Sequence, residues 1–339
     1  MFKLTIAIPT YNGEATIRGS LDSIVSQIED GVEIVISDNA STDKTAEIVH
    51  EYQSKCSNLH YFCNNENLGF DLNVDMAVRK SDGEYVWLLG DDDEIASGGI
   101  KKVIKVLQNN NNLAAIFVNY SWYDRETGKY MRERNLLIWN DIFYGNSDQF
   151  LSTVSIYPRF FSSNIVRRSL WLQADNKRYI GTGWMHYGTL LLILPSNSAY
   201  CIADPYVVAK SFNISAKGGN KGGAALKIHL NLLNIIEELP RGLYSEKSIK
   251  KLLKLIYALL PRIISNSRRN GLFLSWPLLN NLIKKFGSYP SFWLIDIPLL
   301  LLPRFVHNLI RRVYYKLYVY KLYRDHVKCK LFRRPFLGN

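Results

Sequence analysis

Short apolar segments rich in β-branched residues alternate with helical patterns throughout the first 120 residues. Strand character is found over residues 4–8, 32–36, 59–62, 85–89 and 114–118. Helices are expected between these segments, over residues 17–28, 45–52, 72–78 and 97–108. Strands that alternate with helices form βαβ units, so the sequence predicts an α/β fold with a mainly parallel sheet. Ligands of such sheets bind beyond the carboxyl ends of the strands.

The pattern changes after this region. Residues 119–209 are irregular, apart from an expected hairpin near 126–128 and an expected helix near 186–194. Residues 215–223 contain four glycines and two lysines, which predicts a flexible basic loop. Helices are expected beyond it, over residues 224–239, 245–264 and part of 291–325. The chain of 339 residues is therefore expected to consist of a part over 1–223 and a helical part over 224–339.

The net charge of +12 is carried by the second part. Residues 240–339 hold 20 Lys and Arg but only 3 Asp and Glu, whereas residues 1–239 hold 22 and 27. The nearly apolar run over residues 292–302 is too short for a membrane span, which needs about 20 residues. Arginines, lysines and tyrosines alternate over 304–324, as in segments that lie on anionic membranes. Binding of nucleic acid phosphates by these cations is the alternative.

The N-terminus and the cysteines indicate the compartment. The only apolar run near the N-terminus is residues 4–8, which is shorter than the apolar segment of a signal peptide. The four cysteines form no C-x-x-C pair and are too few for a disulfide scaffold. We therefore expect reduced thiols and a cytoplasmic protein, bound peripherally to the inner face of the cell membrane.

An acidic cluster, Gly90-Asp91-Asp92-Asp93-Glu94, directly follows the apolar strand at 85–89. Adjacent carboxylates repel one another, and a divalent cation among them relieves that repulsion. The cluster is either such a cation site or a solvated acidic turn.

Three segments together resemble family 2 glycosyltransferases: IAIPTYN at 6–12, EIVISDNASTD at 33–43 and the acidic cluster. The resemblance covers about residues 3–120 and implies the GT-A fold, a nucleotide-binding α/β sheet with a DxD motif after its fourth strand. It also implies a nucleotide-binding half over 1–120 and an acceptor half over 121–223. The combination of the acidic cluster with the element at 181–186 is similar to the branch that includes abequosyl-type O-antigen transferases.

The resemblance assigns nucleotide contacts to five positions. Pro9, Thr10 and Tyr11 match the turn that cups the base and ribose, although Tyr11 could also be a packed turn aromatic. Asp38 matches the carboxylate that accepts the N3–H of uracil or thymine, or it caps its own turn. A cytidine donor would leave Asp38 without that bond, so the base stays open. Asn67, with Gly69, matches a turn near the nucleotide, and a simple loop is the alternative.

The resemblance also assigns roles within the acidic cluster. Asp93, the last carboxylate of the DxD motif, would bind Mn²⁺ or Mg²⁺, and Asp91 would contact the ribose or a metal-bound water. The cation would neutralise the leaving nucleotide diphosphate. The roles of Asp92 and Glu94 stay open.

Many relatives supply the general base from a Glu-Asp pair about ninety residues after the DxD motif, and this sequence has no such pair. His186 lies at that distance, and imidazole has a suitable pKa. The alternative is a histidine near the start of a helix that bonds its neighbours, with Asp175 or Asp204 as the base. Trp184 is either a sugar platform or a core residue.

Further cations could bind diphosphates or lie as ordinary surface charge. These are Lys217 and Lys221 for the donor, and Arg159, Arg167 and Arg168 for the acceptor. The expected function is inverting transfer of a sugar, a hexose or deoxyhexose, from a nucleotide-diphosphate donor. The expected acceptor is a hydroxyl of a polyprenyl-diphosphate-linked oligosaccharide in O-antigen or other surface polysaccharide synthesis. A nucleic-acid-binding protein, which we do not expect, and an inactive membrane scaffold with a transferase fold are the alternatives.

Overall fold

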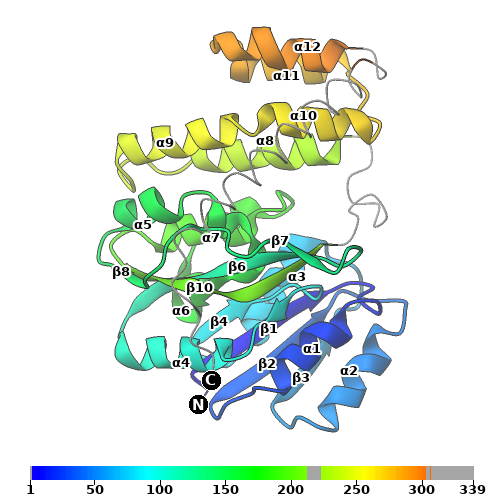
Figure 1. The fold of residues 1–339 in the computed structure, drawn as a ribbon, viewed down its shortest axis with the longest axis vertical. Coiled ribbons are helices and arrows are strands. Elements are labelled where there is room, and N and C mark those ends of the chain that lie inside the picture. The colour runs from blue at the N-terminus through cyan, green and yellow to red at the C-terminus, as the bar shows by residue number, and fades with distance from the viewer. Residues whose placement is uncertain (1, 212–222, 303–305, 307–339) are drawn as a thin grey trace. The chain divides into compact units, whose positions relative to one another are not determined.

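A computed structural model describes residues 2–211, 223–302 and 306 (Figure 1). The predicted loop lysines Lys217 and Lys221 therefore lie outside the described residues, and so does the basic segment 304–324 apart from residue 306. The strands are β1 (Leu4–Thr10), β2 (Val32–Asp38), β3 (Leu59–Cys63), β4 (Tyr85–Leu88), β5 (Glu94–Ile95), β6 (Leu113–Asp124), β7 (Lys129–Arg132), β8 (Ile142–Tyr144), β9 (Asn164–Arg167) and β10 (Ser198–Ser211). The helices of the first 200 residues are α1 (Ile17–Val25), α2 (Thr45–Gln53), α3 (Phe70–Lys80), α4 (Gly99–Asn109), α5 (Ser147–Val154), α6 (Arg168–Gln173) and α7 (Met185–Ile193).

The N-terminal part of the sheet is parallel, in the order β3-β2-β1-β4. Every residue of β1 and β2 is buried, as expected for strands that are covered on both faces. Thr10 is paired with Asp38 at the ends of β1 and β2. All five strands predicted over residues 4–118 are present, so the predicted mainly parallel sheet is confirmed for this part of the chain.

The second part of the sheet inserts an antiparallel strand. β9 lies between β4 and β6 and is antiparallel to both, and β6 continues to β10 in parallel. The predicted hairpin near residues 126–128 connects β6 to β7, with Gly128 at a φ of 66°. The sequence prediction missed β9 and β10, which connect this part of the chain to the core of the sheet.

β10 carries a large bulge. Its pairing with β6 shifts from Val118–Ile202 to Tyr120–Val207, so Asn119 faces four residues of β10. The side-chain nitrogen Nδ2 of Asn119 donates to the backbone carbonyls of Leu136 and Ala203 at 2.7 and 2.8 Å. This buried amide therefore satisfies backbone groups that the interrupted ladder leaves open.

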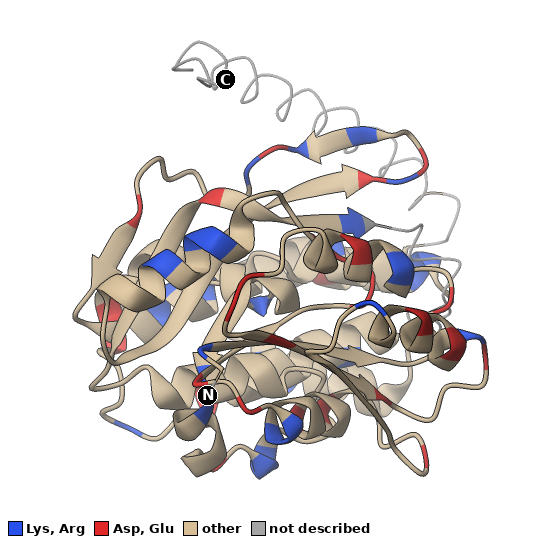
Figure 2. Cartoon of the chain, turned by 90° about the horizontal axis from the view of Figure 1, so that it is seen from below, with Lys and Arg blue, Asp and Glu red and all other residues tan. Residues whose placement is uncertain are grey.

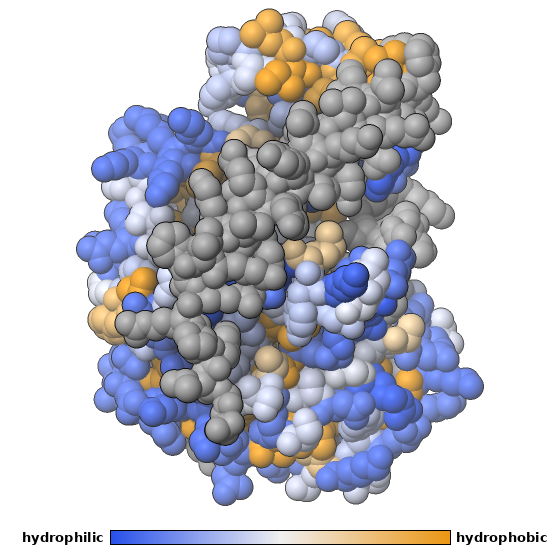
Figure 3. Space-filling model, in the orientation of Figure 1, coloured by the Kyte–Doolittle hydropathy of each residue, from blue (hydrophilic) through white to orange (hydrophobic). Residues whose placement is uncertain are grey.

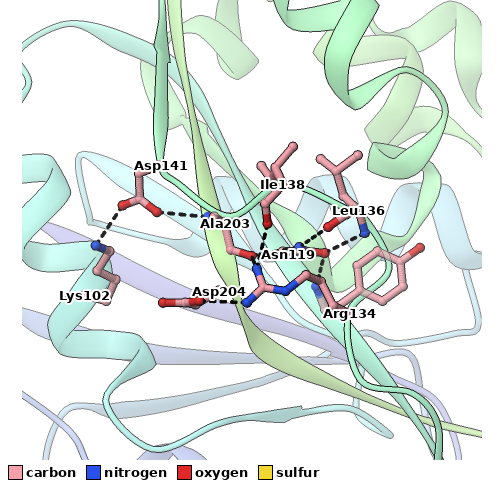
Figure 4. A network of polar contacts seen from close by, with 9 residues as sticks. Lys102, Asn119, Arg134, Leu136, Ile138, Asp141, Ala203 and Asp204 are labelled. Atoms are coloured by element: carbon pink, nitrogen blue, oxygen red, sulfur yellow. Dashed lines mark hydrogen bonds and ion pairs between the residues drawn. The ribbon is translucent and has the colours of Figure 1, made fainter. Parts of the chain in front are cut away.

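Charged side chains also bind the backbone of this bulge and stabilise it (Figure 4). Arg134 Nη2 bonds Asp204 Oδ1 at 2.9 Å, and Nη1 donates to the carbonyl of Ala203. Asp141 accepts the Ala203 amide at 2.9 Å and pairs with Lys102 at 2.7 Å. The bulge is thus fixed by two ion pairs, one of which uses the carboxylate of Asp204.

The C-terminal helices are α8 (Ala224–Glu237), α9 (Glu246–Tyr257), α10 (Leu260–Arg269), α11 (Trp276–Phe286) and α12 (Ile297–Leu301). A π-helical turn over Phe292–Asp296 directly precedes α12. The single helix predicted over 245–264 is wrong, because α9 ends at Tyr257 and α10 begins at Leu260, with Pro261 in its first turn. The expected cap at Ser97 is also absent, since Gly98 precedes α4 with a φ of 79° and no side-chain cap bond forms.

The described residues form two compact units. Residues 2–211 and 228–257 make up the first, and residues 223–227 and 258–302 belong to the second. The predicted boundary after residue 223 rests on composition alone and stays a prediction. None of the helices within the described ranges combines the length and the apolar character that crossing a bilayer requires.

Candidate functional site

The candidate site lies where β1, β2 and β4 end. Because these strands are parallel, their carboxyl ends meet at one edge of the sheet. The structure brings the predicted residues Thr10 and Asp91 together there, since Thr10 Oγ1 donates to Asp91 Oδ2 at 2.6 Å. The backbone amide of Asn39 donates to the Thr10 carbonyl at 2.9 Å. Gly13 keeps this contact open, because a Cβ there would lie 2.4 Å from Thr10 Oγ1. The turns after β1, β2 and β4 therefore form one connected surface.

Asp38 is buried at the end of β2. Its Oδ1 accepts the Ser41 amide at 2.8 Å, and its Oδ2 accepts the Tyr61 hydroxyl at 2.7 Å. Burial, and then the hydrogen bond to Asp38, raise the pKa of Tyr61. The turn-capping role considered for Asp38 is therefore present, and each carboxylate oxygen still has a second lone pair for another donor.

The turn after β1 presents an aromatic ring. Pro9 and Thr10 are buried, whereas Tyr11 is exposed at the same edge. Asn12 follows with a left-handed φ of 51° and fixes the neighbouring turn, since its Oδ1 accepts the Thr42 amide at 2.9 Å. The turn is thus held in place while the Tyr11 ring remains accessible.

A cluster of asparagines that hydrogen-bond one another stabilises these turns. Asn39 Nδ2 donates to Asn67 Oδ1 at 2.8 Å, and Asn67 Oδ1 also accepts the Gly69 amide at 2.9 Å. Asn64 Nδ2 donates to Asn39 and to Asn73 at 3.1 and 3.0 Å. The sequence prediction included Asn67 and missed the other three, although residues 64–73, which lie before and in the first turn of α3, contain four asparagines.

The side chains of the acidic turn point in different directions. Asp91 contacts Thr10, whereas Asp93 is 6% exposed and turns inward. Asp93 Oδ2 accepts the Ser162 hydroxyl at 2.5 Å, and its Oδ1 accepts the Lys210 amide at 3.2 Å. Burial, and then the charge of Asp92, raise the pKa of Asp93 to about 8. Sequence reasoning missed Ser162 and Lys210, which lie far from the turn along the chain.

Three oxygens converge above Gly90. A Cβ at this position would lie 3.1 Å from Asp92 Oδ1, 3.2 Å from Asp93 Oδ2 and 3.3 Å from Ser162 Oγ. Hard divalent cations bind such oxygens, and Mg²⁺ keeps several waters when few protein ligands are present. Within the described parts of the chain, no three His, Cys, Asp or Glu side chains gather closely enough to hold a metal. The residues therefore fit a cation held by few protein ligands, and the metal role of Asp91 and Asp93 stays a prediction.

His186 lies near the start of α7 and is 4% exposed. Its Nε2 lies 3.1 Å from the Arg159 carbonyl, so Nε2 carries the proton, and the buried Nδ1 has no partner. Burial lowers the pKa of His186 to about 4, which leaves the imidazole neutral at pH 7. The rings of Phe161 and Trp184 lie 5.3 and 5.9 Å from the imidazole.

The two alternative bases have other partners. Asp175 lies on the surface in an ion pair with Arg178, and Asp204 belongs to the β10 bulge. A carboxylate that sequence reasoning missed, Asp71, fixes the loop before α7: its Oδ2 accepts the Gly183 amide at 2.8 Å. His186 is therefore positioned by α3 through Asp71.

Comparisons with known proteins identify the family that the chain resembles. Residues 5–171 match the model of the family described as Glycosyl transferase family 2. The abequosyltransferase RfbV of Salmonella typhimurium is 28% identical over 269 residues, which cover 73% of this chain and 78% of that protein. The GalNAc(5)-diNAcBac-PP-undecaprenol beta-1,3-glucosyltransferase of Campylobacter jejuni is 25% identical over 248 residues, covering 73% and 77%.

Solved structures show the same fold. S. aureus TarS 1-349 in complex with UDP-GlcNAc is similar with a TM-score of 0.62 and 20% identity, over 86% of this chain and 81% of that chain. The mannosyltransferase PcManGT from Pyrobaculum calidifontis, in complex with GDP-Man and Mn²⁺, has a TM-score of 0.53 and 17% identity, over 88% and 85%. The predicted α/β fold of GT-A type is confirmed, and so is the resemblance stated from the three sequence segments.

Proposed function

Because residues 5–171 match the family 2 glycosyltransferase model, we propose that the chain is such an enzyme and transfers one sugar from a nucleotide-diphosphate donor to a lipid-linked oligosaccharide. The contact between Thr10 and Asp91, which joins the base-side turn to the acidic turn, carries this proposal. Support for the acceptor comes from the name of the Campylobacter jejuni relative, a transferase for an undecaprenol-linked substrate. The reaction would belong to the synthesis of O-antigen or another surface polysaccharide.

The donor nucleotide would bind across the turns after β1 and β2. The exposed ring of Tyr11 would stack on the base, with Pro9 and Thr10 beneath it. Asp38 would accept a base N–H through a remaining lone pair, and Asn67 would shape the adjoining turn. TarS binds UDP-GlcNAc and PcManGT binds GDP-Man, so the fold accommodates more than one base.

The acidic turn would hold the donor's diphosphate through a cation. Asp93 would bind Mn²⁺ or Mg²⁺ beside the oxygen of Asp92, while Asp91 would contact the ribose or a metal-bound water. When bound, the cation supplies Lewis-acid stabilisation of the leaving nucleoside diphosphate. The hydroxyl of Ser162 and the amide of Lys210 orient the Asp93 carboxylate for this task.

His186 would take the proton from the acceptor hydroxyl. Its Nδ1 has no hydrogen-bond partner, because Nε2 faces the Arg159 carbonyl, and the imidazole stays neutral at pH 7. Since Nδ1 is buried, the surrounding side chains would have to move for the acceptor hydroxyl to reach it. The rings of Phe70, which is exposed, and Trp184, which is half-buried, both lie next to the imidazole of His186. These two rings would provide an apolar surface against which a sugar ring packs.

Donor binding should depend on the divalent cation. We expect one nucleotide sugar from a panel of uridine, thymidine, cytidine and guanosine diphosphate sugars to raise the thermal unfolding midpoint when Mn²⁺ is present. Excess chelator should remove most of that stabilisation and abolish transfer to the acceptor, and added Mn²⁺ should restore both. Full transfer activity in chelator would contradict the metal role, and the absence of stabilisation by every donor would favour an inactive scaffold.

The second unit is the part of the chain that would contact the membrane. Its described residues expose many large apolar side chains: Phe273, Trp276, Tyr289, Trp293, Leu294, Ile295 and Leu301. Figure 3 shows apolar surface over the segment that contains α11 and α12. In the cartoon of Figure 2, which views the chain from below, segments with Lys and Arg are interspersed with segments with Asp and Glu. Exposed aromatic and aliphatic groups suit a lipid surface better than nucleic acid, so we propose peripheral binding to the membrane face that presents the acceptor.

Two of these exposed residues provide a test. Phe273 is 82% exposed and Trp276 is 73% exposed, so replacing both by Ser should cost the fold little. We expect the double variant to bind vesicles containing anionic lipid about tenfold more weakly, because two large apolar groups no longer enter the bilayer surface. The control replaces Leu137 and Trp139, which are exposed in the first unit, by Ser. Equal binding of all three proteins in a sedimentation assay would disprove this surface.

A further inference from the structure

Asp71 is a buried carboxylate that lies between the first turns of two helices. It is the second residue of α3. Its Oδ2 accepts the Gly183 amide at 2.8 Å, and its Oδ1 accepts the Met185 amide at 3.1 Å. Met185 begins α7, and Trp184 before it makes no side-chain cap bond within the described chain. The carboxylate of α3 therefore caps α7 from a neighbouring helix, and it binds an amide that the start of a helix leaves open.

The backbone of the loop before α7 allows its amides to face Asp71. Gly181 and Gly183 have φ values of 80° and 78°, in the left-handed region that glycine adopts without strain. α8 holds the same loop, because Trp184 Nε1 donates to the Ile228 carbonyl at 2.7 Å. The loop is thus fixed by α3 and α8 together, and its bonds to α3 include the first amide of α7.

The start of α3 is also bonded to the turns after β1 and β2. Asn67 Oδ1 accepts the Gly69 amide at 2.9 Å and Asn39 Nδ2 at 2.8 Å. The backbone amide of Asn39 in turn donates to the Thr10 carbonyl at 2.9 Å. Gly69 immediately precedes α3, so Asp71 lies only two residues beyond this bonded turn. One short segment therefore contacts both the turns proposed for the donor and the loop before α7.

His186 depends on where α7 begins. It directly follows Met185, whose amide Asp71 binds, so its position along and around the helix axis is set by that first residue. The ring of Phe70, which precedes Asp71, lies 6.3 Å from the imidazole and perpendicular to it. A general base must lie within hydrogen-bond reach of the acceptor hydroxyl, and a displacement of about 1 Å is enough to lower the rate.

We propose that Asp71 is a positioning residue that fixes the distance between the bound donor and the base. Its two hydrogen bonds hold the start of α7 against a helix that begins at the donor turns. This inference deepens the proposed function and rests on it, because it takes His186 as the base and the turns after β1 and β2 as the donor site. A merely structural carboxylate would affect turnover only through stability, whereas a positioning residue affects turnover in a protein that remains folded.

Asp71→Asn tests this role. The oxygen of asparagine can accept one of the two amides, but its NH2 group then faces the other, so one bond is lost and the start of α7 shifts. We expect kcat to fall roughly 10- to 100-fold at a temperature where the variant is folded. The dissociation constant of the donor should stay within about twofold of the wild-type value, because the bonds of Asn67 and Gly69 remain.

Asp75→Asn is the matched control for this variant. Asp75 is a buried carboxylate one turn later in α3, where it accepts Trp171 Nε1 at 2.9 Å and Arg79 Nε at 2.7 Å. Its replacement should lower the unfolding midpoint, since a charged hydrogen bond is weakened, and leave kcat near that of the wild type. Wild-type kcat in Asp71→Asn, or equal losses of kcat in both variants, would overturn the proposal.

A spectroscopic measurement needs no transfer reaction. The ring nitrogens of His186, labelled with ¹⁵N and assigned by their loss in His186→Gln, report the proton on Nε2 that faces the Arg159 carbonyl. We expect their chemical shifts to change in Asp71→Asn and to keep their wild-type values in Asp75→Asn. If no donor and acceptor support transfer while the shifts change in this way, the proposed function fails and the positioning of His186 by Asp71 remains. Unchanged shifts in Asp71→Asn would show that Asp71 does not position the imidazole.

A conservative variant decides the question if Asp71→Asn does not fold. Asp71→Glu keeps both carboxylate oxygens for the two amides but moves them by one methylene group, so it should retain more stability than Asp71→Asn. We expect kcat of this variant to fall about 3- to 10-fold and the ring shifts of His186 to change. Wild-type kcat and wild-type shifts in Asp71→Glu would contradict a positioning role.

Discussion

Asp93→Asn should lower the turnover number by roughly 10²- to 10³-fold, because a cation ligand that stabilises the leaving diphosphate contributes several kcal/mol. The fold should survive the change. Asparagine has the same shape, its oxygen can accept the Lys210 amide, and it mimics the neutral carboxyl that burial favours at this position. The substitution therefore removes charge from the acidic turn with little change in packing.

The pH dependence of stability checks this interpretation in chelator. Burial raises the pKa of Asp93 to about 8, so the native state keeps the proton more strongly than the unfolded state. The free energy of unfolding should therefore fall as pH rises toward 8, and Asp93→Asn should lose that part of the slope. The matched control is Asp175→Asn, which alters a surface carboxylate and should leave turnover unchanged. Near wild-type turnover by Asp93→Asn at saturating donor would rule out the metal role.

His186→Ala should lower turnover by roughly 10²- to 10⁴-fold, the usual contribution of a general base. Donor affinity should be unchanged, because the imidazole does not touch the turns after β1 and β2. His50→Ala is the control, since that histidine is exposed on α2. Turnover near that of the wild type with intact donor binding would exclude His186 as the base.

The pH–rate profile provides a second measurement for His186. Because burial lowers the pKa of this group to about 4, a base at this position stays unprotonated through the neutral range. We expect kcat/KM to stay flat between about pH 5.5 and 8, with no loss near 6.5, where an ordinary histidine titrates. A fall of activity centred near 6.5 that persists in His186→Gln would show that another group titrates.

The sequence was sufficient to predict the edge of the sheet that bears the candidate site. Apolar runs that end in Thr10, Asp38 and the acidic turn place polar residues at the carboxyl ends of three parallel strands. Parallel pairing alone then requires them to meet. The contact between Thr10 and Asp91 shows that the turns after β1 and β4 meet at this edge, and the functional roles of these residues stay predictions.

The directions of the side chains could not be predicted in the same way. Asp91 and Asp93 are two residues apart, yet one contacts Thr10 and the other turns toward Ser162 and Lys210. Those partners arrive on β10 and on the turn before β9, whose insertion into the sheet leaves no local sequence pattern. Likewise, the indole of Trp184 donates to the carbonyl of Ile228 in α8, which is more than forty residues away along the chain.

The bulge in β10 gives this strand two independently adjustable halves. Residues 199–201 pair with β8, and residues 207–208 pair with β5, on either side of the four extra residues. Since Lys210 orients Asp93 through its amide, an insertion or deletion within residues 203–206 would slide that amide along the sheet and leave the strand's first half in register. A change in the length of this neighbouring strand could therefore alter the orientation of Asp93 during evolution, without replacing any carboxylate of the acidic turn.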